Sequence, residues 1–230
     1  MIRKRHLTYS LRAIATLLLL IWMSACATTE NTATNASASE TSDLEALYWS
    51  RIDSSRASFT EADVNFMTGM IAHHAQALIM SRLAPENGAA EPVQRLAARI
   101  INAQKDEISS MQRWLRDRDQ PVPKIQIEGL NLMVEIAGQP YTSYKNMHGV
   151  LSQEQLEELA GARGTDFDRL FLTYMIEHHS GAVHMVENLF SADGAAQDEE
   201  AFRLASDIQV DQRTEIERMN LMLEQLPDLS

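Results

Sequence analysis

Two pairs of adjacent histidines, His73-His74 and His178-His179, are the residues of this chain with the clearest capacity for chemistry. Each pair stands between two methionines, and a glutamate and a third methionine follow in the next predicted helix. Imidazoles with soft thioethers suit Cu(I), and imidazoles with a carboxylate also accept Cu(II) or Zn(II). The candidate metal ligands are His73, His74, Met70, Met80, Glu107 and Met111 in the first set, and His178, His179, Met175, Met185, Glu215 and Met219 in the second.

The two sets belong to an internal repeat. Residues 66–80 match residues 171–185 at a shift of 105 positions, with Phe, Thr, Met, Ile, both His, Ala and the last Met unchanged. A second echo relates Gln104–Met111 to Gln212–Met219 at a shift of 108. The three extra residues fall between the two matching segments, as expected when helices are kept and the loop between them varies.

Hydrophobic periodicity and helix-boundary signals predict the elements that position these side chains. Thr60 with Asp63 makes a capping-box pattern, and Thr165 with Asp168 repeats it in the second copy. Long helices are expected over about 61–83, 92–117, 166–190 and 198–226, with Pro85, Pro121 and Pro227 as stop signals. They form two antiparallel hairpins, about 60–118 and 165–226.

The connection between the hairpins is less regular. Residues 125–137 are expected to form a short helix, which Gly138-Gln139-Pro140 ends. Ser152 opens another short helix through a capping box. We therefore expect an all-α protein, a ferritin-like four-helix bundle made of two similar antiparallel helix hairpins joined by a long, partly helical crossover.

Helical geometry places Glu107 in the middle of a face otherwise made of Leu, Ile, Met and Trp. A carboxylate there is costly unless it is paired, hydrogen-bonded or bound to a metal, and the repeat gives Glu215 the same place. One histidine of each pair is expected to meet the glutamate of the same hairpin, because a bond from an imidazole N–H to a carboxylate satisfies both groups. The two histidines of a pair point about 100° apart, so a pair does not by itself chelate one ion. His184 is expected on the outer surface.

The N-terminal segment predicts export and anchoring. Basic residues followed by the apolar run Ala13–Met23, which is short for a bilayer span, predict a signal peptide over 1–25. The stretch Met23-Ser24-Ala25-Cys26 resembles the lipobox of bacterial lipoproteins, so Cys26 is the predicted lipidation site and membrane anchor. Residues 26–43 are polar and small and predict a disordered tether, and residues 44–230 are long enough for a single helical domain.

Composition excludes several function classes. The chain has a net charge of −12, and loss of the signal peptide removes four basic residues and no acids, which makes it −16. Such a surface predicts no nucleic-acid binding and favours attraction of cations. Cys26 is the only cysteine, so the domain has no disulfide framework, no thiolate metal site and no cysteine nucleophile. The sequence leaves homo-oligomer formation open.

The doubled pattern Met-Ile-x-His-His-x-x-Ala-x-x-Met, each followed by Gln-x-x-Glu-Ile-x-x-Met, resembles the bacterial domain of unknown function 305 (DUF305) family over about residues 59–223. The linker Met147-His148-Gly149-Val150-Leu151 is similar to that family's Met-Pro-Gly-Met-Leu stretch, from which His148 and Val150 depart. The resemblance implies a ferritin-like helical bundle, usually extracytoplasmic. It also implies copper binding through Met and His in some members.

We expect a lipid-anchored copper-binding protein of the bacterial cell envelope, periplasmic or extracytoplasmic, that stores, buffers or delivers the metal and is not an enzyme. One alternative is a structural or interaction module without metal, in which the His and Glu form a buried hydrogen-bonded clasp and the Met residues fill gaps. A ferritin-like redox enzyme is disfavoured, because di-iron bundles use Glu-x-x-His and the chain has none.

Overall fold

The computed structural model describes residues 41–51, 54 and 58–227. The chain divides into two units, Met1–Ser54 and Ser55–Ser230, and a helix over 41–51 belongs to the first. The predicted signal peptide, Cys26 and the tether up to residue 40 lie outside the described residues. Among the helices that are described, none combines the length and apolar character of a membrane span.

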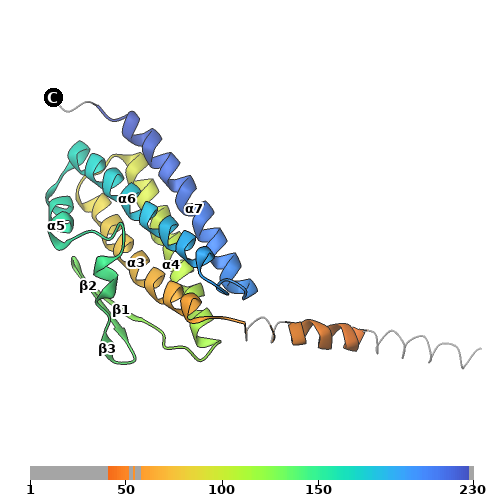
Figure 1. Ribbon diagram of the computed structural model, residues 1–230. Coiled ribbons are helices and arrows are strands. Elements are labelled where there is room, and N and C mark those ends of the chain that lie inside the picture. The colour runs from red at the N-terminus through yellow and green to blue at the C-terminus, as the bar shows by residue number, and fades with distance from the viewer. Residues whose placement is uncertain (1–40, 52–53, 55–57, 228–230) are drawn as a thin grey trace, which may run out of the picture. The chain divides into compact units, whose positions relative to one another are not determined.

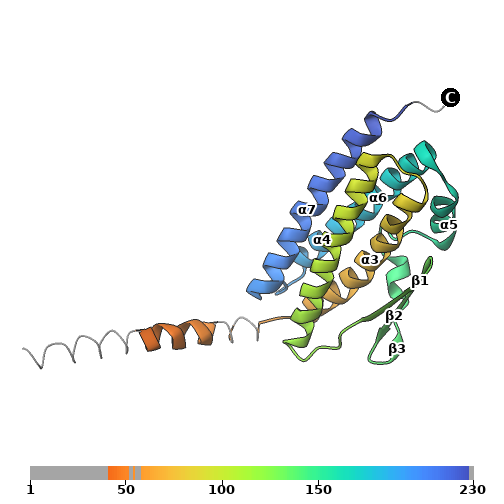
Figure 2. The same cartoon turned by 180° about the vertical axis from the view of Figure 1, so that it is seen from behind.

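Four long helices form the bundle of the second unit: α3 (Glu61–Glu86), α4 (Glu91–Arg116), α6 (Gly164–Ser191) and α7 (Glu199–Glu224). Helix α3 packs on α4 and on α6, α6 packs on α7, and α7 contacts α4 (Figure 1). Seen from behind, α4 and α7 form the opposite side of the same bundle (Figure 2). The helical bundle of two hairpins that the sequence predicts is therefore confirmed.

The crossover contains a small sheet where the sequence analysis expected a helix over 125–137. Strands β1 (Lys124–Glu128), β2 (Asn131–Ile136) and β3 (Gln139–Pro140) pair antiparallel in that order. The short-helix prediction is wrong because apolar residues alternate here with a period of two and Gly129, at φ +58°, makes the turn between strands.

Two short helices complete the crossover. A 3-10 helix, η1 (Ser143–Asn146), follows the sheet, and α5 (Gln153–Gly161) begins at the capping box of Ser152, as predicted. The side-chain amide of Asn87, at the end of α3, donates to the carbonyl oxygens of Leu159, Ala160 and Ala162 at 3.2, 3.0 and 2.8 Å. This amide fixes the end of α5 against the first hairpin.

Helix α3 is buried around its whole circumference. Every residue from 66 to 81 is buried, whereas α4 buries a single face. The sheet, η1 and α5 all contact α3, so the crossover covers the side of this helix that the other bundle helices leave open. Helix α3 therefore buries all of its sides between residues 66 and 81, in place of the one apolar face that α4 buries.

The helix starts of the two hairpins differ from the predicted symmetry. Thr60 and Asp63 form a full capping box, as predicted. Helix α6 begins earlier, after Arg163 and with no side-chain cap, so the predicted cap by Thr165 and Asp168 is wrong. The buried Asp168 carboxylate instead accepts the backbone N–H of Ala90, the residue before α4, at 3.1 Å.

Asp63 makes the matching bond across the bundle. Its Oδ1 accepts the backbone N–H of Ala196, in the loop before α7, at 2.7 Å. Each hairpin therefore uses the aspartate at the start of its first helix to hold the loop of the other hairpin. The repeated aspartate therefore forms a hydrogen bond between the two hairpins, in addition to any bond within its own hairpin.

Candidate metal centre at the bundle axis

The second histidine of each pair meets the glutamate of its own hairpin. Nε2 of His74 donates to Oε2 of Glu107 at 2.6 Å, and Nε2 of His179 donates to Oε2 of Glu215 at 2.7 Å. The histidines are completely buried, and the glutamate side chains retain 15% and 11% of their exposure. The predicted pairing is present in both hairpins, and the structure selects the partner that the sequence left open.

The first histidine of each pair lies between the hairpins. The rings of His73 and His178 face each other with centroids 3.9 Å apart and planes tilted by 40°. Nε2 of His73 donates to the carbonyl oxygen of His148, in the crossover, at 3.3 Å. The four histidines therefore form a continuous buried group at the interface of α3 and α6.

Several nitrogens of this group have no partner. Nδ1 of His73, His74 and His179 is buried without a hydrogen bond, as are both ring nitrogens of His178. With Nε2 of His74 and of His179 donating to a carboxylate, the neutral form of each ring places its lone pair on Nδ1. Leaving buried polar atoms unpaired costs about 1–3 kcal/mol each, unless a ligand takes them.

Two glutamines add to the unpaired polar atoms. Both side-chain amide atoms of Gln104 are buried without a partner, as is Oε1 of Gln212. These residues stand three positions before Glu107 and Glu215 in the repeated motif. Each hairpin therefore contributes a buried glutamine oxygen whose lone pairs have no hydrogen-bond partner.

Burial keeps the central histidines neutral. It lowers the pKa of His73 to about 3, with a further lowering from neighbouring His74. Burial, followed by the repulsion that a proton on His178 would meet from a protonated His73, also holds the pKa of His178 well below its usual range. Neutral imidazoles present the lone pairs that metal coordination requires.

Carboxylates gather where α4 meets α7. Partial burial raises the pKa of the Asp211 carboxyl, and the charges of Glu107, Glu215 and Asp207 add to the rise. Sequence reasoning did not single out Asp211, although its spacing of four residues before Glu215 places like charges on one helix face. The negative potential of this group favours a cation near the two His–Glu pairs.

The six candidate methionines divide between two apolar clusters. One holds Met70 and Met111 with Met185 packed against it, and the other holds Met80, Met175 and Met219. Each cluster thus combines two thioethers from one hairpin with one from the other. In the described ranges, 41–51, 54 and 58–227, no three His, Cys, Asp or Glu side chains stand arranged to hold a metal ion.

The crossover closes over the histidines through contacts that the sequence did not reveal. Gln76 holds Leu151 by two hydrogen bonds, because its Nε2 donates to the Leu151 carbonyl at 2.9 Å and its Oε1 accepts the Leu151 N–H at 2.7 Å. Gly181 lets the crossover lie directly on α6, since a Cβ there would be 1.9 Å from the His148 carbonyl oxygen. A glutamine beside a histidine pair gives no sequence signal of this role.

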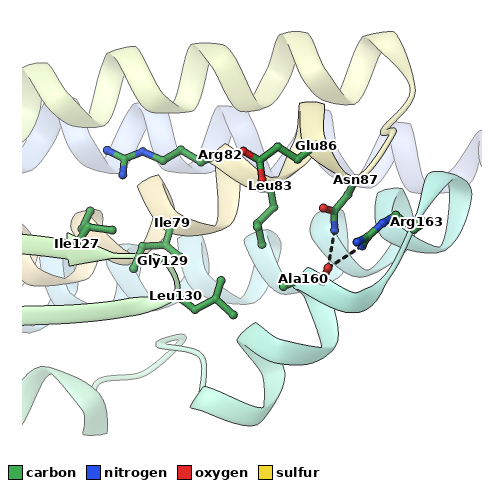
Figure 3. Close-up of a pocket in the computed structure, with 10 residues that line it drawn as sticks. All are labelled: Ile79, Arg82, Leu83, Glu86, Asn87, Ile127, Gly129, Leu130, Ala160 and Arg163. Carbon is green, nitrogen blue, oxygen red and sulfur yellow. Dashed lines mark hydrogen bonds between the residues drawn. The ribbon is translucent and has the colours of Figure 1, made fainter.

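A separate pocket of about 610 Å³ lies where the β1–β2 turn meets the end of α3 (Figure 3). Arg82, Glu86 and Arg163 line it, and the side chains of Asn87 and Arg163 both point to the Ala160 carbonyl. The ten lining residues include none of the candidate metal ligands. This pocket is therefore distinct from the histidine centre.

Comparison with known proteins identifies relatives of this architecture. A DUF305 fragment from Deinococcus radiodurans is 30% identical with a TM-score of 0.59, covering 73% of this chain and 99% of its own. A Streptomyces coelicolor DUF305 protein described as secreted is 26% identical with a TM-score of 0.58, covering 71% and 91%. The comparison with curated proteins finds no match.

A third similar structure is CopM in a Cu(I)-bound form, at 28% identity and a TM-score of 0.51, covering 70% of this chain and 95% of its own. CopM has also been solved with Cu(II) and with silver bound. The sequence pattern of the domain of unknown function DUF305 matches residues 63–223, which span both hairpins and the crossover. The chain belongs to the DUF305 family.

Proposed function

We propose that this protein is an extracytoplasmic, lipid-anchored copper-binding protein that stores, buffers or delivers the metal and does not catalyse a reaction. The observation that carries the proposal is the set of buried imidazole nitrogens without partners at the interface of α3 and α6. A group of this kind is costly in the free protein and becomes favourable when a metal ion takes the lone pairs.

The His–Glu pairs support the proposal because they have the arrangement of metal-binding histidines. A ligating histidine commonly donates its other ring N–H to a carboxylate, which fixes the tautomer and makes the free nitrogen more basic. Glu107 and Glu215 make this bond to His74 and His179. His73 and His178 lie beside them as further nitrogen ligands.

The choice of copper rests on the soft donors and on a similar protein. Thioethers of the candidate methionines favour Cu(I) over harder ions, and imidazoles bind both copper states. CopM, whose structures hold Cu(I), Cu(II) and silver, is 26–28% identical to this chain over most of its length. The lipobox-like sequence at Cys26 and the described secretion of a relative support the location in the cell envelope.

The first test is a Cu(I) competition titration of the purified protein against a chromogenic chelator. The variant with His73, His74, His178 and His179 changed to Ala is expected to lose the tight binding. The single variants His73→Ala and His178→Ala are expected to lower the metal capacity by similar amounts, since the two hairpins present equivalent histidines. Circular dichroism checks the fold, and the exposed Glu217→Ala in α7 serves as the control.

The same titration separates copper binding from the clasp alternative. The short hydrogen bonds of His74 and His179 also fit a purely structural role, in which they only hold the helices together. A folded wild type that does not compete for Cu(I), or a quadruple variant with wild-type capacity, contradicts the proposed metal centre. The first result leaves the His–Glu pairs as a clasp.

A further inference from the structure

Two exposed histidines outside the buried centre lie side by side. His148 comes from the crossover and His184 from α6, and their ring centroids are 5.7 Å apart with planes tilted by 55°. Both side chains are exposed, in contrast to the four completely buried histidines. Neither belongs to the repeated His-His pairs, and the central site leaves both unused.

The backbone beneath this pair is held firmly in place. His148 lies directly on α6 because Gly181 has no side chain, and its carbonyl oxygen accepts the N–H of His73. Gly149 has φ +79° and lies against the α6 backbone, where a Cβ would be 2.5 Å from the Glu177 carbonyl oxygen. The position of His148 relative to His184 is thus fixed by close backbone contact instead of by the histidine rings themselves.

The separation of the rings fits a shared ion. A metal–nitrogen distance of about 2.1 Å puts each ring centroid roughly 3.2 Å from the ion, so two imidazoles at the tetrahedral angle have centroids roughly 5.3 Å apart. The observed centroid separation of 5.7 Å is close to that value. Two imidazoles alone provide half of a tetrahedral coordination shell.

Two methionines adjacent in sequence to these histidines bring their side chains together over α3. The methyl carbons of Met147 and Met185 both lie over Gly69, where a Cβ would be 2.9 Å from one and 3.3 Å from the other. Each methionine is adjacent in sequence to one histidine of the pair. We count these two thioethers as candidate donors beside the two imidazoles, because sulfur and nitrogen donors together select soft ions.

The geometry points to a second, solvent-facing metal site in which His148 and His184, with Met147 and Met185, bind Cu(I). The inference rests on the proposed copper function and adds a place where the ion first meets the protein. His148 contacts the buried centre through its carbonyl oxygen, which accepts from His73. An ion held at the surface thus lies next to the crossover segment that covers the buried histidines.

The test uses the full chain and titrates it with Ag(I), which has the same soft preference as Cu(I) and no accessible redox change, followed by Cu(I) under reducing conditions. The double variant His148→Ala/His184→Ala is expected to lose one equivalent of bound ion and to keep the buried sites. Histidine-ring NMR signals of His148 and His184 are expected to shift during the titration. Asn188→Ala, an exposed change one turn after His184, is the control.

A second variant tests the thioethers. Met147→Leu/Met185→Leu keeps the apolar volume. It is expected to weaken Ag(I) binding at this site by about tenfold or more, because loss of a residue that only supports a ligand already costs about that much affinity. Zn(II) binding to the His148–His184 pair is expected to change less, because Zn(II) does not depend on thioethers. Equal loss of both ions contradicts the assigned soft donor set.

The outcomes separate this site from the buried one. Full Ag(I) capacity in His148→Ala/His184→Ala, with unshifted ring signals in the wild type, overturns the surface site and leaves the central proposal intact. If the variant lacking the four buried histidines still binds one equivalent through His148 and His184, the surface site is supported whatever the buried histidines do. Absence of binding in every variant and in the wild type overturns both.

Discussion

The two helix hairpins share their chemistry and differ where the crossover touches them. Both hold a buried histidine on a glutamate, at 2.6 and 2.7 Å. Two of the repeat positions that differ contact the crossover: Gly69 in α3 corresponds to Tyr174 in α6, and Gln76 corresponds to Gly181. The two glycines leave room for the crossover, and Gln76 and Tyr174 form hydrogen bonds to it.

Each of these four residues has a contact that explains it. Gly69 makes room for Met147, and Tyr174 at the equivalent position makes a short hydrogen bond to Glu158 in α5. Gln76 holds Leu151, and Gly181 admits His148. The comparison teaches that the polar centre constrains both hairpins equally, whereas a single crossover on one side breaks their symmetry.

The largest effect we expect concerns the central histidines, where the hairpins are alike. The lowered pKa of His73, about 3 against 6.5, means that the unfolded chain binds the proton more readily. Stability is therefore full above about pH 6.5 and falls as the pH drops toward 3, by up to about 1.4 kcal/mol per pH unit for each histidine. His178 acts in the same direction.

Urea unfolding of the metal-free protein between pH 7 and 4 measures this dependence. His73→Gln and His178→Gln are each expected to flatten the curve by a similar amount, and the double variant to flatten it most. A pH profile that neither substitution changes would contradict the assignment of neutral, buried histidines to both hairpins.

The next effect tests the difference between the hairpins. In Gly181→Ala the new methyl would lie 1.9 Å from the His148 carbonyl oxygen, so the crossover must move off α6. Overpacking of this kind typically costs about 1–3 kcal/mol. Gly161→Ala at the end of α5, with nothing within 4 Å of the new Cβ, is the matched control. Denaturant unfolding that finds equal stability in the two variants shows that the crossover is not held by this contact.

The smallest effect compares the two aspartates at the helix starts. Asp63 holds the other hairpin and also completes the capping box with Thr60, whereas Asp168 only accepts from Ala90. Asp63→Ala is therefore expected to lower stability more than Asp168→Ala, by about 1 kcal/mol, the usual contribution of a helix cap. The reverse order in thermal or urea unfolding contradicts the separate roles assigned to the two residues.

The sequence predicted the hairpins well because their information is local and appears twice. The period of the apolar residues, the Thr60 capping box and the repeated Glu107 and Glu215 together indicated paired helices with one polar centre. The same reasoning failed at 125–137, where alternation of Ile125, Ile127 and later Val134 indicated strands and was read as a helix. A short segment with few apolar residues fits both the helical period of 3.6 and the strand period of two, so the pattern alone does not distinguish a helix from a strand here.

The remaining features depend on contacts between distant segments. Asp168 has the same sequence signature as Asp63, yet its partner is the loop before α4, which no local pattern indicates. The burial of α3 on all sides depends on where the crossover runs. The meeting of His148 and His184 likewise follows from that path, and a sequence pattern alone treats both as ordinary surface residues.

The exchanged bonds of Asp63 and Asp168 give the bundle a pseudo-twofold pattern of contacts. Each hairpin carries both halves of the contact, the carboxylate and the loop N–H, and uses each on its neighbour. Reciprocal contacts of this type are those of an isologous two-fold dimer. The two hairpins of this single chain therefore meet through the contact pattern of a two-fold homodimer, with the crossover as the covalent link between its halves.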